Sequence, residues 1–242
     1  MEVTKKSGLF YFKQFSIAQD QCSMKVGTDG VLLGAWADVT NAQQILDIGA
    51  GTGVIAIMLS QRSEKAQIHA IEIDELAAKQ AADNIQNSPW TTRLSIINQS
   101  IQDYGKSSEQ KYDLIVSNPP FFSGGTFSHN QDRNDVRHTV KLPHGDLLIA
   151  VRRLLSREGK FCVILPLIEG MRFKEIAADY SLFCTKVTKV KPKVSKPVER
   201  LLLQFERVES PEIVDELVIQ KEGRNNWTEA YIDLTRAFYL KM

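Results

Sequence analysis

The sequence predicts an α/β fold with a seven-stranded, mostly parallel sheet and helices on both faces. Two observations support this fold class. Short apolar runs typical of strands alternate with longer segments of helical periodicity, and a glycine-rich turn follows the first long apolar run. With 43% hydrophobic and 24% charged residues, the composition is that of an ordinary folded protein and excludes disorder as the main state.

The elements are expected in the following order. Residues 1–40 should form an N-terminal element, with a hairpin within 9–27 and a helix at 28–37 that has Thr28 as its N-cap. In the main domain, residues 41–242, strands are predicted at 43–48, 67–73, 94–98, 112–117, 160–165, 183–190 and 200–206. Helices are predicted at 53–62, 74–87 and 145–156, and an amphipathic helix at 227–242 should pack against the domain.

Cysteine content and hydropathy indicate the compartment. Cys22, Cys162 and Cys184 lie far apart without a CxxC pair, which argues against a disulfide framework and a zinc site. We interpret them as small buried side chains in a reducing environment. The best apolar run, at 161–168, is too short to cross a bilayer, and no signal sequence is recognisable. We therefore expect a cytoplasmic monomer that binds no metal and no membrane.

The first motif is a glycine-rich turn between the strand at 43–48 and the helix at 53–62. Three glycines occupy alternate positions in it, Gly49, Gly51 and Gly53. Glycine lets the chain turn sharply and lets a ligand approach the backbone closely. Glu72 ends the second strand nineteen residues after the last of these glycines, where a carboxylate can bind both hydroxyls of a ribose.

The spacing of this motif argues against a dinucleotide, because the third glycine of GxGxxG would fall at Val54. Asp47 suits a ligand with a positively charged amino acid moiety instead. DIGAGTG with a distal acidic residue resembles the motif of class I, Rossmann-like methyltransferases. That resemblance implies S-adenosylmethionine as cofactor, bound by Asp47, the three glycines and Glu72.

In that family a polar residue after the third strand usually contacts the adenine of the cofactor. The resemblance assigns this role to Asp103. Gln102 is the neighbouring alternative, and Asp103 could equally cap the short helix that follows.

The second motif, Asn118-Pro119-Pro120-Phe121, follows the strand at 112–117, at a carboxyl end where open α/β sheets bind ligands. The two prolines fix the backbone and remove two N–H donors. The Asn118 side-chain oxygen and the Pro119 carbonyl can then accept both hydrogens of an exocyclic amino group, and Phe121 can stack on the base. The tetrapeptide resembles the NPP(F/Y/W) signature of methyltransferases that act on amino nitrogens.

Nearly the whole chain resembles a narrower family, the bacterial tRNA1(Val) (adenine-37 N6)-methyltransferases. The similar segments are FKQFSIAQDQCSMKVGTDGVLLGAWA, ILDIGAGTGVIAIML, VSNPPFF and TEAYIDLTRAFYLKM. The resemblance implies methylation of the 6-amino group of the adenosine 3′ of the anticodon, with the second motif holding that adenine. It also places Thr28 and Asp29 over the cofactor, with simple helix capping as the alternative for Thr28.

The net charge of +1 conceals an asymmetry along the chain. Residues 1–121 carry ten basic and thirteen acidic side chains, whereas 122–242 carry twenty and sixteen. Five lysines and Arg200 lie within 186–200 against Glu199 alone. We interpret this cluster as a phosphate-binding segment, with its contacts at Lys191, Lys193 and Lys196. The alternative is a solvated edge strand protected by lysines and prolines.

The loop predicted at 121–146 is long for a compact domain, which favours a lid or a binding function. It contains Arg133 and Arg137, which we interpret as RNA-binding, together with His129 and His138. These side chains are candidate contacts to the anticodon stem-loop of a tRNA.

Three other functions remain open. An rRNA guanine 2-amino methyltransferase also uses NPPF, although the segment KVGTDGVLLG argues against it. A protein-glutamine methyltransferase typically carries NPPY and has no use for the basic segment. An RNA-binding protein without turnover would not need Asp47, Glu72 and Asn118 together.

Overall fold

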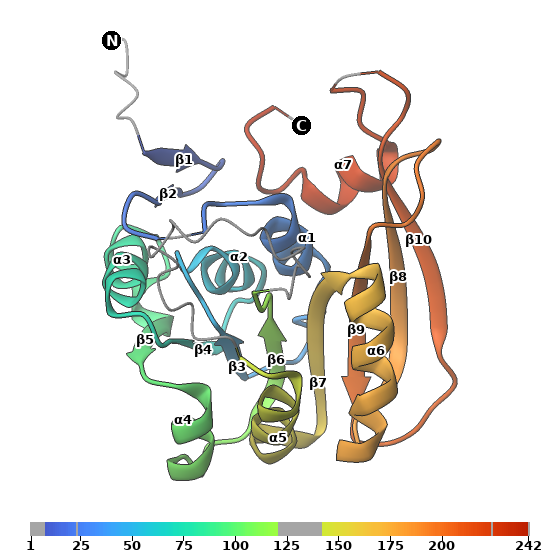
Figure 1. Cartoon of the computed structure of the whole chain (residues 1–242). Coiled ribbons are helices and arrows are strands. Elements are labelled where there is room, and N and C mark those ends of the chain that lie inside the picture. The colour runs from blue at the N-terminus through green and yellow to red at the C-terminus, as the bar shows by residue number, and fades with distance from the viewer. Residues whose placement is uncertain (1–7, 23, 121–141, 224, 242) are drawn as a thin grey trace, which may run out of the picture.

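The computed structural model describes residues 8–22, 24–120, 142–223 and 225–241. Two strands, β1 (Leu9–Tyr11) and β2 (Ser16–Ala18), form the predicted N-terminal hairpin. The other strands form one sheet of eight in the order β10-β8-β9-β7-β6-β3-β4-β5 (Figure 1). Their bounds are β3 Gln44–Ile48, β4 Gln67–Glu72, β5 Leu94–Asn98, β6 Tyr112–Ser117, β7 Leu155–Pro166, β8 Phe183–Lys193, β9 Arg200–Glu206 and β10 Ile213–Gln220.

The sheet is mostly parallel, as predicted, because β9 alone runs antiparallel to its neighbours, β7 and β8. All seven predicted strands are present. The α-helices of the described chain are α1 Thr28–Trp36, α2 Val54–Arg62, α3 Glu75–Gln86, α4 Ile101–Ser107, α5 His144–Leu154, α6 Leu167–Ala177 and α7 Glu229–Thr235.

Helices cover both faces of the sheet (Figure 1). Neighbouring residues on one strand enter two different cores, as with Ile45 and Leu46 on β3. The first core includes side chains of α1, α2 and α7, and the second includes side chains of α4, α5 and α6. Because both faces of the central strands are buried, these strands are mostly apolar rather than alternating, with Asp47 as a buried exception on β3.

Strand β10 was not predicted, and it makes the sheet eight-stranded rather than seven-stranded. It lies at the edge and pairs with β8 alone. Its first four residues, Ile213 to Glu216, are exposed, and Asp215 and Glu216 lie in its middle. Aspartate and glutamate are depleted in strands, so the segment lacks the pattern of a half-buried strand. The strand part of the basic segment, residues 186–193 of β8, is consequently an interior strand, not the edge strand of the alternative interpretation.

Two helix ends also differ from the predictions. Gly27 is the N-cap of α1, and Thr28 is already helical with no side-chain capping hydrogen bond. At the other end of the chain, α7 stops at Thr235 rather than continuing to 242. Phe238 is buried and Tyr239 pairs with Phe12 of the hairpin. The helix ends early because the chain turns back to make these hairpin contacts.

The cysteine prediction holds in part. All three cysteines are free, and Cys162 is buried, but Cys22 and Cys184 are only half-buried. In the described residues no helix is long and apolar enough to span a bilayer.

The C-terminal turn can be tested by comparing two neighbouring side chains. Phe238 is 1% exposed and Leu240 is 57% exposed. We expect Phe238→Ala to lower the free energy of unfolding by about 3–5 kcal/mol, because it removes a buried aromatic ring. Leu240→Ala should change it by less than about 0.5 kcal/mol. Urea unfolding measures both values, and similar losses in the two variants would contradict this turn.

Candidate functional site

The carboxyl ends of β3, β4 and β6 lie side by side, and the residues that follow them form the candidate site. Parallel pairing places Ile48 of β3 beside Ile71 on one side and Ser117 on the other. The Ser117 hydroxyl donates to the Ile48 carbonyl at 2.9 Å and ties the ends of two strands together. The two sequence motifs are therefore neighbours in space.

The three glycines after β3 all have positive φ angles, 73° at Gly49, 53° at Gly51 and 78° at Gly53. Other residues rarely adopt this conformation. A Cβ at Gly49 or Gly51 would meet no atom within 4 Å, whereas one at Gly53 would lie 3.4 Å from the Cβ of Ala81. The first two glycines thus keep open space beside the loop, and the third permits close packing on α3.

Glu72, at the end of β4, is held by the backbone on both sides. One carboxylate oxygen accepts the N–H of Gly51 at 2.8 Å, and the other accepts the N–H of Asp74 at 2.9 Å. Each carboxylate oxygen has two acceptor positions, so both remain able to accept a ligand hydroxyl. The carboxylate is therefore fixed beside the glycine loop but still available for binding.

Asp47 lies beneath the same loop with 0% exposure. Its Oδ2 accepts the N–H of Ala56 at the start of α2, at 3.1 Å, and its Oδ1 has no hydrogen-bond partner in the part of the chain that the structure describes. Burial raises the pKa of this carboxyl to about 7, and the negative charge of Glu72 adds to the rise. A buried, unpartnered carboxylate oxygen is unfavourable in the free protein. A cationic ligand group near it would favour the ionised form.

Asn118 and the two prolines follow β6, across from the glycine loop. Pro119 is buried, and the Asn118 side-chain oxygen is buried without a hydrogen-bond partner among the described residues. Gly30 of α1 lies beside the Asn118 amide, because a Cβ there would be 3.9 Å from Nδ2. The side chain thus presents a free acceptor oxygen. Buried acceptors usually have partners, so this oxygen indicates a binding role.

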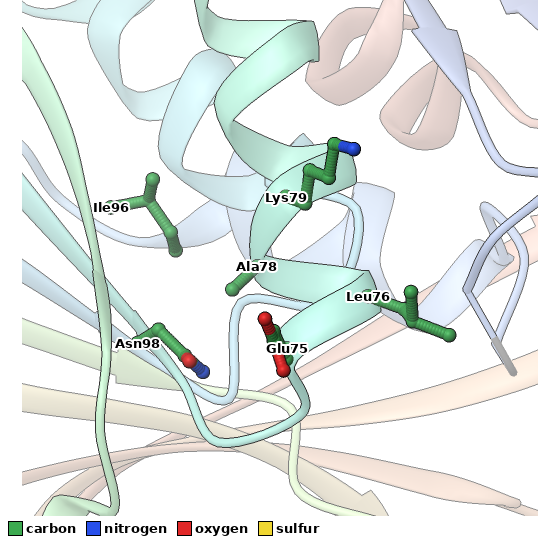
Figure 2. A pocket seen from close by; sticks show the side chains of 6 residues that line it. All are labelled: Glu75, Leu76, Ala78, Lys79, Ile96 and Asn98. Carbon is green, nitrogen blue, oxygen red and sulfur yellow. The ribbon is translucent and has the colours of Figure 1, made fainter.

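One cavity of about 440 Å³ joins the two motifs. Its lining includes Gly49, Gly51 and Glu72 from the first motif and Asn118, Pro119 and Pro120 from the second. A second hollow lies between the start of α3 and β5, and Figure 2 shows the side chains that line it. It shares Glu75 and Leu76 with the first cavity, but none of the described buried, unpartnered polar atoms belongs to its lining. We therefore assign the candidate site to the first cavity.

Several predicted residues lie outside the lining of this cavity. They are Asp47, Gly53 and Thr28, of which Thr28 is exposed on α1. Asp103 is also absent from the lining, whereas Gln102, the alternative, belongs to it. The Asp103 carboxylate instead accepts the hydroxyl of Ser100 at 2.7 Å, and its N–H donates back to that hydroxyl at 3.1 Å. The N-cap of α4 is Ser100, and Asp103 is the third residue inside the helix, so Asp103 assists the cap but is not the capping residue of the alternative interpretation.

Sequence reasoning missed one wall of the cavity. Gln21, Cys22 and Met24, from the segment between the hairpin and α1, belong to its lining. Burial, with a smaller contribution from Glu72, raises the pKa of the Cys22 thiol to about 11, so the thiol stays protonated at neutral pH. The family resemblance includes this segment but gives it no place in the site, because its position depends on contacts with α3.

The predicted RNA-binding residues have different surroundings. Lys191 pairs with Glu216 of β10 at 2.8 Å, so the unpredicted strand neutralises it. Lys193 and Lys196 make no ion pair with any described residue, and they lie at the end of β8 and in the turn that follows. Phe121, Arg133, Arg137, His129 and His138 lie outside the described residues. No described cluster of His, Cys, Asp and Glu is arranged to hold a metal ion.

The chain matches a family model described as "Methyltransferase small domain" over residues 24–164. It is 47% identical over 236 residues to a Flavobacterium johnsoniae protein named tRNA1(Val) (adenine(37)-N6)-methyltransferase, which covers 97% of this chain and 100% of that protein. A protein of the same name from Haemophilus influenzae is 46% identical over 235 residues, covering 96% and 98% of the two chains.

Solved structures show the same fold at low sequence identity. A predicted O-methyltransferase from Agrobacterium tumefaciens superposes with a TM-score of 0.68 at 17% identity, covering 87% of this chain and 96% of that one. A putative RNA methyltransferase from Pyrococcus horikoshii has a TM-score of 0.53 at 17% identity, with coverage of 74% and 82%. The structural matches support the class I methyltransferase fold.

The buried carboxyl of Asp47 leads to a pH-dependent prediction. Its pKa is about 7 in the folded protein against an ordinary 3.8, so the folded state binds this proton more tightly than the unfolded state. Stability conferred by the protonated form is lost as the pH rises from about 4 to about 7. Asp47→Asn removes this pH-dependent loss of stability, because the asparagine side chain does not ionise.

We expect the unfolding free energy of the variant, relative to that of the unsubstituted protein, to rise by about 4 kcal/mol between about pH 4 and pH 8, because the pKa of Asp47 lies about three units above its ordinary value and each unit corresponds to about 1.4 kcal/mol. Urea unfolding of both ligand-free proteins at several pH values measures the difference. A difference that does not change with pH would contradict the raised pKa.

Proposed function

Because the chain belongs to the tRNA1(Val) (adenine(37)-N6)-methyltransferase family, we propose that it methylates the 6-amino group of adenosine 37 in tRNA1(Val). The methyl donor is S-adenosylmethionine. The enzyme acts in the cytoplasm as a monomer. S-adenosylmethionine and adenosine 37 would bind next to each other in the cavity between the glycine loop and the Asn118 motif.

The observation that carries this proposal is the shared cavity. Gly51 and Glu72 line the same space as Asn118, and the described buried polar atoms without partners include Oδ1 of Asp47 and Oδ1 of Asn118. A cationic amino acid moiety suits the first oxygen, and an amino group that donates hydrogen bonds suits the second. S-adenosylmethionine and adenine together meet both requirements.

The residues around the loop fit the cofactor. The Glu72 carboxylate is proposed to bind the ribose hydroxyls, and Gly49 and Gly51 let the ligand lie against the backbone. Asp47 provides negative charge beneath the loop, while Gln102, rather than Asp103, is proposed to contact the adenine. S-adenosylmethionine would supply a methyl group on a sulfonium: the N–C bond forms as the S–C bond breaks, and the leaving group is a neutral thioether. The methylated nitrogen is then acidic and loses its extra proton to water, so the transfer requires no strong general base.

The Asn118 motif has to hold a weak nucleophile. The lone pair of the 6-amino group is delocalised into the adenine ring. Asn118 Oδ1 is proposed to accept one amino hydrogen and the Pro119 carbonyl the other, which favours a tetrahedral nitrogen with its lone pair directed at the methyl group. Pro120 fixes this backbone, and Phe121 is proposed to stack on the base. Alignment of reactants can supply about 7–11 kcal/mol of the barrier.

The end of β8 is proposed to contact the RNA backbone. β8 and β7 both run antiparallel to β9, so β8 ends at the same edge of the sheet as the strands that form the cavity. Lys193 and Lys196 are exposed or partly exposed at this edge. We expect them to bind phosphates of the anticodon stem-loop, with Arg133 and Arg137 as further contacts and Lys191 contributing less.

Product analysis tests the function directly. We expect label in N6-methyladenosine of tRNA1(Val) when the protein is incubated with labelled S-adenosylmethionine and total tRNA or rRNA from a strain without this enzyme.

Asn118→Ala should lower the rate by about 100-fold or more, because it removes an acceptor aligned with the reacting nitrogen. Its affinity for S-adenosylmethionine should stay within about twofold of the original.

Nucleoside mass spectrometry measures the product, and calorimetry measures cofactor binding. Label in 2-methylguanosine would identify the rRNA guanine alternative, and tRNA binding without label would identify the inactive RNA-binding protein. Equal loss of transfer and cofactor affinity in the Asn118 variant would make Asn118 a structural residue.

Charge reversal tests the RNA-binding lysines. The double variant K193E/K196E should raise the Michaelis constant for tRNA at least about tenfold. It should also flatten the slope of log affinity against log salt by up to about two, because each phosphate contact contributes about one. The matched control is K65E/K111E, whose lysines are exposed and precede β4 and β6 at the opposite edge of the sheet. Filter binding at several salt concentrations measures this, and equal effects of the two double variants would refute the assignment.

A further inference from the structure

Two amide side chains on α3 are buried where a helix surface would normally carry apolar residues. Gln80 and Asn84 are each 3% exposed. They are four residues apart and therefore lie on the same face of the helix. Buried polar groups require hydrogen-bond partners. The identity of these partners connects α3 to both walls of the cavity.

Asn84 contacts two segments that are distant in the sequence. Its Oδ1 accepts the N–H of Ala18 at 2.8 Å, and its Nδ2 donates to the Ala18 carbonyl at 2.9 Å. The same Nδ2 donates to the carbonyl of Thr52 in the glycine loop, also at 2.9 Å. One side chain therefore bonds the end of β2 in both directions and holds the glycine loop, and Figure 1 shows β2 lying close to α3.

Gln80 extends this connection by one helical turn. Its Oε1 accepts the N–H of Gln21 at 3.1 Å, and its Nε2 donates to the carboxylate of Asp20 at 2.6 Å. Gln21 and Cys22 line the cavity on one side, and Gly51, next to Thr52, lines it on another. The two amides thus fix the separation of two walls that no strand pairing connects.

We propose that Gln80 and Asn84 are positioning residues that set the affinity for S-adenosylmethionine by holding the 18–22 segment and the glycine loop together. This inference rests on the proposed cofactor. Neither side chain lines the cavity, so their effect reaches the ligand through Gln21, Cys22 and Gly51. The contribution should appear in binding, because the Asn118 motif does not contact these amides.

The donors and acceptors allow a sharp test. Gln80→Glu keeps the acceptor for the Gln21 N–H but sets a second carboxylate against Asp20. Adding Asp20→Asn restores the hydrogen bond with donor and acceptor exchanged. Asn84→Asp keeps the acceptor for Ala18 but replaces the donor to two carbonyls. Asn87→Ala is the control, because Asn87 is an exposed amide at the end of the same helix that donates only to the Asp83 carbonyl.

Calorimetric titration of the full chain with S-adenosylmethionine is the primary measurement. We expect Q80E and N84D to weaken binding about tenfold, the effect of losing about one well-made hydrogen bond. D20N/Q80E should recover to within about twofold, and N87A should match the unsubstituted protein. The turnover number at saturating cofactor should change less than about twofold, and hydrogen exchange of the backbone amides at 18–22 should be faster in Q80E and N84D.

Three results would contradict different parts of this inference. Unchanged cofactor affinity in Q80E and N84D, with only a lower melting temperature, would overturn the inference and make the amides purely structural. Failure of D20N/Q80E to recover would overturn the role of the Gln80–Asp20 bond. If the unsubstituted protein itself does not bind S-adenosylmethionine, the proposed cofactor is wrong, which is a different failure.

Discussion

Parallel pairing of β3 with β4 on one side and β6 on the other is the constraint on which the site depends. It brings the residues after Ile48, Ile71 and Ser117 to one edge of the sheet. The N–H groups of Gly49 and Ala50 both donate to the Ile71 carbonyl, at 2.9 and 3.0 Å, so the glycine loop begins from the end of the neighbouring strand. A shift in this register would separate the two motifs and divide the cavity.

The site contains buried polar atoms without hydrogen-bond partners among the described residues, an arrangement that lowers the stability of the ligand-free protein. Oδ1 of Asp47 and Oδ1 of Asn118 are buried and have no partner among the residues that the structure describes. Such groups cost free energy unless they are hydrogen-bonded. The surrounding apolar cores are large enough to tolerate this cost. Stability given up at a site of this kind is common where binding a ligand requires it.

The positive charge of the basic segment depends on which of its lysines lie beside the acidic residues of β10. The acidic residues of β10 lie beside the lysines of β8, so that Lys186 and Lys191 pair with Asp215 and Glu216. Positive charge without a described ion pair remains at Lys193, where β8 ends at the same edge of the sheet as the cavity. Some lysines of the basic segment, such as Lys186 and Lys191, therefore pair within the sheet, whereas Lys193 is available to bind a polyanion.

Sequence alone determined the seven strands, the glycine turn and the position of Asn118, because strand, turn and helix signals depend on neighbouring residues. It did not reveal β10, the turn after Thr235, or the choice of Gln102 over Asp103 in the lining. Each of these depends on partners far away in the chain: β8 for the edge strand, the hairpin for Phe238, and the cavity for the side chains of α4. The buried amides of Gln80 and Asn84 have the same origin, since their partners lie 59 and 66 residues earlier in the chain. Local chemistry thus specified which groups the site contains, and tertiary packing decided which of them face the ligand.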